Sequence, residues 1–140
     1  MGHYSTVGRN RWASAAALIA AAAALSACGS QGAAEVDSVA LHFARSVANS
    51  ADAAACRDLA PSTRSELEQS EGEPCSQALA SQKLPSPGSL RGTQVFNTTS
   101  QASFAHDTFF LGKFHGGWKI IAAGCTPKPD QPYDCILQGG

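Results

Sequence analysis

Charge is sparse in this sequence and forms no blocks. Of the 140 residues, 10 are Lys or Arg and 11 are Asp or Glu. A protein that binds nucleic acid needs a basic face, and the sequence shows no cluster of basic residues that would build one. A polybasic segment for anionic lipids is missing as well. The composition therefore predicts no nucleic-acid partner.

The common motifs of enzymes and metal sites are also missing. The sequence has no G-x-S-x-G around a serine nucleophile and no glycine-rich phosphate loop after a strand. It has no C-x-x-C, and the spacings of its cysteines match no common zinc pattern. We therefore predict no catalytic residue, no metal and no cofactor.

The first 27 residues have the three parts of an export signal. Arg9 and Arg11 make its start positive, and an alanine-rich apolar run over residues 13–25 follows. This run is shorter than the ~20 residues that a membrane-spanning helix needs. Small residues then lead to Cys28.

The stretch Leu25-Ser26-Ala27-Cys28 resembles a bacterial lipobox. The resemblance implies that the chain is cut before Cys28 and that the thiol of Cys28 carries a diacylglycerol. Two acyl chains hold a protein on a membrane durably. We expect a signal peptide over residues 1–27, a lipidated tether over 28–34 and a location on the extracytoplasmic face of the cell membrane. An ordinary cleaved signal with an incidental cysteine is the alternative.

The number of cysteines agrees with this cleavage. An exported protein with five cysteines would keep one free thiol, and lipidation of Cys28 leaves an even number. The remaining four, Cys56, Cys75, Cys125 and Cys135, allow three pairings. We favour Cys56–Cys75 and Cys125–Cys135, because the partners of each pair are close in sequence. In the loop-entropy model each bridge contributes about 3 kcal/mol.

Residues 35–140 are expected to form one α+β domain. Val36, Val39, Ala40, Phe43 and Val47 recur at helical spacing. They predict a helix over 35–49, and shorter helices are predicted over 52–59, from Thr63 and from Pro74. Residues 84–88 predict a hinge, because they contain two prolines and a glycine.

Strands are expected after the hinge. Alternating or apolar stretches predict strands over 93–99, 101–106, 108–114 and 118–122, and His115-Gly116-Gly117 predicts a hairpin turn. Residues 125–135 contain three prolines, so we expect an irregular loop there. Helices followed by antiparallel strands give an α+β fold, with N-terminal helices on a small curved sheet.

Two groups of residues carry a family resemblance. They are Cys56-x-x-Leu59-x-Pro61-x-Thr63 with Leu67-Glu68 and Cys75, and the tail from Gly117-Trp118-Lys119-Ile120 to Pro132-Tyr133-Asp134-Cys135. The pattern resembles small actinobacterial lipoproteins of unknown function. The segment order is similar to the cone-shaped NTF2-like fold, which implies a pocket between helices and sheet. The family offers no settled activity to transfer.

Three residues are candidates for lining such a pocket: His106, Trp118 and Tyr133. His106 precedes Asp107, and an imidazole beside a carboxylate can act as a general base. Neighbouring residues of a strand point to opposite faces, however, and a turn explains the pair equally well. Asp107 and Lys113 are the charged residues between Gly92 and Trp118, and both are expected to be exposed.

We therefore expect a membrane-anchored, non-enzymatic binding or accessory module of the cell envelope. Its partners would be membrane lipid through Cys28 and either a small apolar ligand or an envelope protein. An NTF2-like enzyme acting on a small apolar substrate is the alternative. Burial of His106 or Asp107 in a cavity with a polar partner would reverse this order and place the enzyme first.

Overall fold

The computed structural model describes residue 2 and residues 31–139. The expected signal peptide and Cys28 lie outside the described residues. Within the described part, no helix is both long and apolar enough to cross a membrane.

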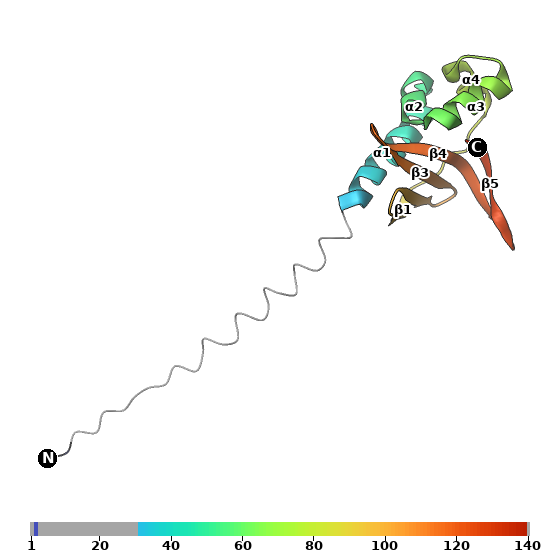
Figure 1. The fold of residues 1–140 in the computed structure, drawn as a ribbon. Helices are drawn as coiled ribbons and strands as arrows, with labels where there is room; N and C mark the ends of the chain where they lie inside the picture. Colours follow the sequence, from blue (N-terminus) through green and yellow to red (C-terminus); the bar gives the residue numbers. More distant parts are fainter. Residues whose placement is uncertain (1, 3–30, 140) are drawn as a thin grey trace. The chain divides into compact units, whose positions relative to one another are not determined.

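Four helices come first along the chain (Figure 1). They are α1 (Gln31–Ala48), α2 (Asp52–Asp58), α3 (Pro61–Glu71) and α4 (Cys75–Ser81). The helix α1 begins four residues before the expected start, so residues 31–34 are helical rather than a tether. Its first turn packs on the sheet, since a Cβ on Gly32 would lie 3.4 Å from Val95 Cγ1.

The helix α3 begins at Pro61 and not at Thr63. Proline suits the first turn of a helix, because its missing N–H would have no partner there. Thr63 lies inside the helix, is 1% exposed and donates a hydrogen bond from Oγ1 to the carbonyl of Ile121 at 3.0 Å. Its hydroxyl thus joins α3 to the sheet and does not cap the helix.

Five strands follow and form one antiparallel sheet. They are β1 (Leu90–Phe96), β2 (Thr99–Phe104), β3 (Thr108–Phe114), β4 (Gly117–Lys128) and β5 (Gln131–Gln138), in the order β1-β2-β3-β4-β5. The predicted hairpin joins β3 to β4, and Gly117 at its end has a φ of +104°. The α+β fold class is confirmed.

The expected loop over residues 125–135 is instead part of the β4–β5 hairpin. Cys125 pairs with Cys135, Thr126 with Asp134 and Lys128 with Gln131. Pro132 is tolerated because β5 is an edge strand, where one side of the backbone needs no partner, and Pro129 lies in the turn between the strands. Pro127 lies at the register shift between Thr126 and Lys128.

The core lies between the helices and one face of the sheet. Phe43 of α1 meets Phe109 of β3 edge-on, with ring centroids 5.6 Å apart, and Phe104 lies 4.6 Å from Phe109. The backbone N–H of Ala60 donates to the carbonyl of Ile120 at 2.8 Å and extends the sheet towards the helices. Helices cover this face of the sheet in Figure 1.

The sheet has two distinct ends. The turns at 97–98 and 115–116 lie at one end, which also holds the start of α1 beside Val95; we call it the near end. The turns at 105–107 and 129–130 lie at the other, far end. The helix α1 runs from the near end towards the far end, where Phe43 reaches Phe109.

Candidate functional site

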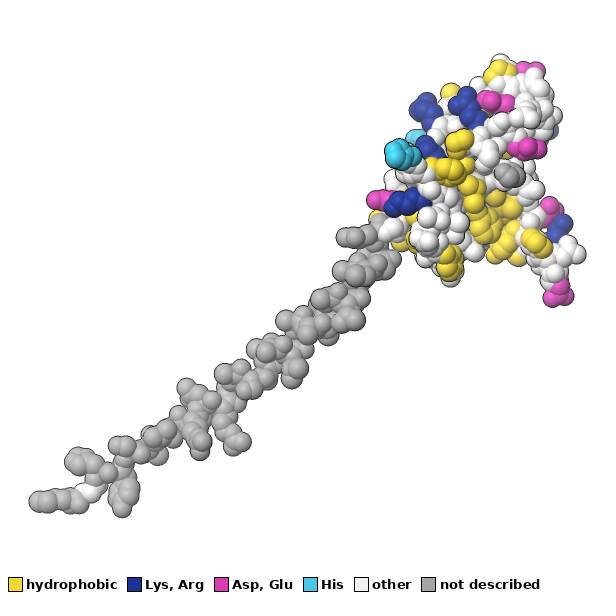
Figure 2. All heavy atoms as spheres, viewed as in Figure 1, with side chains coloured by type: hydrophobic (Ala, Val, Ile, Leu, Met, Phe, Trp, Pro, Cys, Tyr) yellow, Lys and Arg dark blue, Asp and Glu magenta, His cyan; other side chains and the backbone are white. Residues whose placement is uncertain are grey.

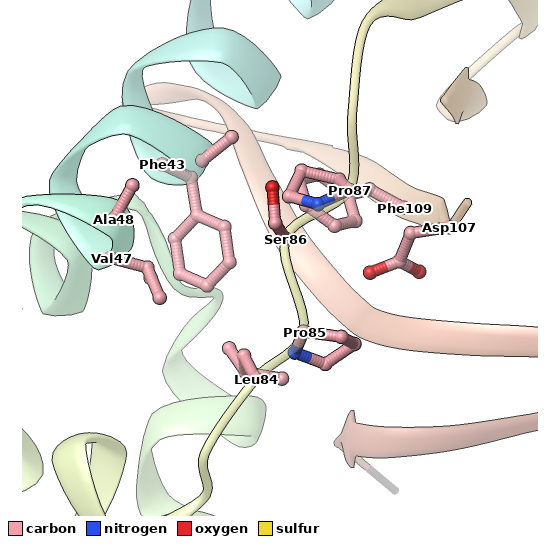
Figure 3. Close-up of a pocket in the computed structure, with 10 residues that line it drawn as sticks. Phe43, Val47, Ala48, Leu84, Pro85, Ser86, Pro87, Asp107 and Phe109 are labelled. Carbon is pink, nitrogen blue, oxygen red and sulfur yellow. The ribbon is translucent and has the colours of Figure 1, made fainter. Parts of the chain in front are cut away.

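A cleft opens at the far end, between the last turns of α1, the segment 84–87 and β3 (Figure 3). Its volume is about 360 Å³, at the small end of the range for ligand pockets. The residues that line it are Phe43, Ala44, Val47, Ala48, Leu84, Pro85, Ser86, Pro87, Asp107 and Phe109. The walls are thus mainly apolar.

The segment 84–87 forms one wall of this cleft. Two prolines fix its backbone in an extended form. Two hydrogen bonds hold its end against the turn at 105–107: His106 N donates to the carbonyl of Pro87 at 2.9 Å, and Ala105 N to that of Ser89 at 2.9 Å. The segment 84–87, which we expected to be a hinge, is therefore held in place and lines the cleft.

Asp107 is the polar centre of the site, and its expected exposure was wrong. Its side chain is 7% exposed, and its Oδ1 accepts hydrogen bonds from the backbone N–H of Thr108 at 2.6 Å and of Cys125 at 2.7 Å. Both bonds end on Oδ1, and the residue lines both this cleft and the smaller depression that holds His106. Figure 3 shows the carboxylate pointing to the space beside Pro85 and Pro87.

A bulge in β4 brings the N–H group of Cys125 to the carboxylate. The register shifts between Thr108 and Phe110, where β3 pairs with β4. Gly124 has a φ of +67°, and a Cβ there would lie 3.0 Å from the side chain of Ile136. Only glycine fits such a left-handed position without strain. Asp107 thus has a structural role, since it binds a backbone N–H beside the bulge.

Burial raises the pKa of the Asp107 carboxyl above its ordinary value of 3.8. Desolvation is the largest cause, because an apolar surrounding disfavours the charged form. The backbone amides of Cys125, Thr108 and Gly124 oppose this effect and lower the pKa. Asp107 is the one titratable side chain among the described residues that line the cleft.

The three candidate pocket residues lie in three different places. His106 is exposed and lines a smaller depression of about 200 Å³, which shares Pro85 and Asp107 with the cleft. Trp118 is 4% exposed in the core, and its Nε1 has no hydrogen-bond partner in the described part of the chain. Tyr133 packs edge-on against Phe110, with ring centroids 5.0 Å apart. None of them lines the cleft.

Both predicted disulfides are confirmed. Cys56–Cys75 joins α2 to α4, and Cys125–Cys135 joins the paired strands β4 and β5. The second bridge stands next to the site, because Cys125 N donates to Asp107. No group of three metal-ligating side chains occurs in residues 31–139.

Sequence reasoning missed the residues that build the walls. Phe43 and Val47 were assigned to the core stripe of α1, and the segment 84–87 to a hinge. The two prolines around Ser86 were the available signal, since they predict a stiff extended segment. Comparisons with protein-family models, with curated proteins and with solved structures find no match for this chain.

Proposed function

We propose that this protein is an extracytoplasmic lipoprotein, anchored through Cys28, that binds a small and mainly apolar molecule in the cleft. The observation that carries the proposal is the carboxylate of Asp107 in the lining of a mainly apolar cleft. A few well-placed polar groups in an apolar pocket are typical of ligand sites. The ligand would therefore carry a hydrogen-bond donor, as a hydroxyl or an amine does.

Three further observations support the anchored binding module. The segment before Cys28 has the composition of an export signal, and both disulfides suit an oxidising compartment. Four helices on one face of an antiparallel sheet agree with the expected resemblance to the NTF2-like fold. We propose that the fold is a variant of the cone-shaped NTF2-like fold with a shorter sheet.

Calorimetric titration with three probes tests the proposal. The probes n-octanol, n-octylamine and n-octanoate share one apolar tail and differ in the head group. Octanol and octylamine are expected to bind, and octanoate at pH 7 at least tenfold more weakly, because its carboxylate would meet that of Asp107. Asp107→Asn should reduce the difference between octylamine and octanoate. Equal binding of all three probes to the wild-type protein, or none, would contradict the proposal.

An enzyme that acts on a small apolar substrate is the second candidate. The burial of Asp107 in a cavity favours it, because a carboxylate with a raised pKa can take a proton from a bound molecule. The polar partners of Asp107 are backbone amides, however, and the described residues of the lining offer no second titratable group to complete an acid–base pair. We therefore place binding first. A ligand that is recovered chemically changed with wild-type protein, but unchanged with Asp107→Asn, would reverse this order.

A further inference from the structure

The face of the sheet opposite the helices has no covering element in the described part of the chain. Side chains of alternating residues reach this face, which we call the uncovered face. Its large hydrophobic members are Phe96, Phe110, Phe114, Ile121 and Tyr133. Figure 2 shows hydrophobic side chains gathered over the sheet, beside the β4–β5 hairpin.

Two of these aromatic side chains are strongly exposed at the near end. Phe96 is 58% exposed and Phe114 is 40% exposed. They belong to neighbouring hairpins, because Lys113 N donates to the carbonyl of Thr98 at 2.8 Å. Two exposed aromatic rings thus lie at the same end of the sheet, and exposed apolar patches mark contact surfaces.

Three basic residues lie at the near end, and two of them share a depression with Phe114. Arg57 of α2 and Lys119 of β4 line one open depression together with Phe114, and Lys119 Nζ donates to the carbonyl of Arg57 at 2.7 Å. Lys113 precedes Phe114 and lies over the ring of Trp118. None of these three cations is in an ion pair within residues 31–139. The fold thus assembles a basic cluster from segments that are far apart in the sequence.

The near end also holds the start of α1, which the chain connects to Cys28. Only Gly29 and Ser30 stand between Cys28 and Gln31, where α1 begins. Three extended residues span roughly 10 Å at most. Gly32 packs against Val95, the neighbour of Phe96. An anchor at Cys28 would therefore hold the near end at the membrane surface.

From these observations we propose that the near end docks on the lipid bilayer, with Phe96 and Phe114 in the headgroup layer and Arg57, Lys113 and Lys119 against lipid phosphates. Aromatic rings favour this layer, and basic residues near an anionic surface are attracted to it. The proposal rests on the lipid anchor of the proposed function. It orients the cleft, at the far end, away from the membrane.

Fluorescence quenching by brominated lipids tests this orientation. Lipidated protein is reconstituted into vesicles of phosphatidylcholine and phosphatidylglycerol, with Phe114→Trp as the reporter. Ile136→Trp is the matched control, because Ile136 is 45% exposed but lies on β5 beside Gly124, towards the far end. The buried Trp118 supplies the background, measured in the wild-type protein. We expect quenching at position 114 and none above background at position 136.

Charge variants test the basic cluster. In the Phe114→Trp background, Lys113→Gln should lower the ratio of docked to undocked protein about fivefold, as expected for one charge near an anionic surface. Arg91→Gln, at the opposite end of β1, should leave it unchanged. Vesicles of phosphatidylcholine alone carry no net negative charge, so docking on them should be weakened as it is by Lys113→Gln.

Flotation of the vesicles separates the two proposals. Protein that does not float with the vesicles lacks the anchor, and both proposals then fall. Protein that floats but shows equal quenching at positions 114 and 136, or none at either, keeps the anchor and overturns the docking. Near-ultraviolet circular dichroism of each variant confirms that the environment of Trp118, and hence the fold, is retained.

Discussion

The backbone N–H of Cys125 donates a hydrogen bond to Oδ1 of Asp107 at 2.7 Å, between residues that are 18 positions apart. This contact joins the turn before β3 to the bulge of β4 and to the Cys125–Cys135 bridge. It also fixes the orientation of the Asp107 carboxylate in the lining of the cleft. The carboxylate of Asp107 thus makes a structural hydrogen bond and is also the proposed binding group of the cleft.

The pH dependence of stability should report the burial of Asp107. Its pKa is raised in the folded state, so the folded protein holds this proton more tightly than the unfolded chain does. The unfolding free energy therefore falls as pH rises from the unfolded pKa, near 4, through the folded pKa. Asp107→Asn lacks this titration. In urea unfolding between pH 3.5 and 7, the unfolding free energy of Asp107→Asn should rise with pH relative to that of the wild type. If the two free energies changed with pH in parallel, the raised pKa of Asp107 would be contradicted.

Two buried hydroxyl groups should respond in opposite ways to removal. Ser100 is 2% exposed and its Oγ has no partner in the described part of the chain, whereas Thr63 Oγ1 donates to the Ile121 carbonyl. An unpaired buried polar group costs stability and a paired one contributes about 1 kcal/mol. Ser100→Ala should therefore be neutral or stabilising, and Thr63→Val should destabilise by about 1 kcal/mol. Equal losses in denaturant unfolding would disagree with this assignment.

The two disulfides should contribute unequally. Their partners are 19 and 10 residues apart. The loop-entropy model then gives the Cys56–Cys75 bridge an advantage of about 0.6 kcal/mol. The gap should widen further, because β4 and β5 remain paired by backbone hydrogen bonds without their bridge, whereas α2 and α4 are short helices. Thermal unfolding of the two double-alanine variants measures the difference, and a larger loss for Cys125 and Cys135 would contradict it.

Local patterns predicted the elements, but not the places where separate segments meet. The stripe through Val36 and Phe43 predicted α1, and the spacing of the cysteines predicted both bridges. The start of α1 was missed because its first turn is held by Val95, a contact distant in sequence. The three prolines after Cys125 concealed a strand pair, because Pro127 lies at a register shift, Pro129 lies in the turn and Pro132 lies on the edge strand β5.

The burial of Asp107 could not be predicted from the sequence either, because it also depends on a contact between distant segments. A residue in a turn between two strands is usually solvated, and only the bulge at Gly124 supplies the N–H group of Cys125 across the sheet. The basic cluster was also hidden, because Arg57 lies on a helix while Lys113 and Lys119 lie on strands. Contacts of this kind follow from the packing of the whole domain.

Native mass spectrometry of the protein, gently extracted from its own membrane, tests the central claim most directly. Ala48 lines the cleft but is exposed, so Ala48→Trp should fill the cleft without disturbing the core. Ala80→Trp, at an exposed position of α4, is the matched control. We predict a reproducible small-molecule adduct on the wild-type and Ala80→Trp proteins and none on Ala48→Trp. A bare wild-type protein, or an adduct that Ala48→Trp retains, would contradict a ligand in this cleft.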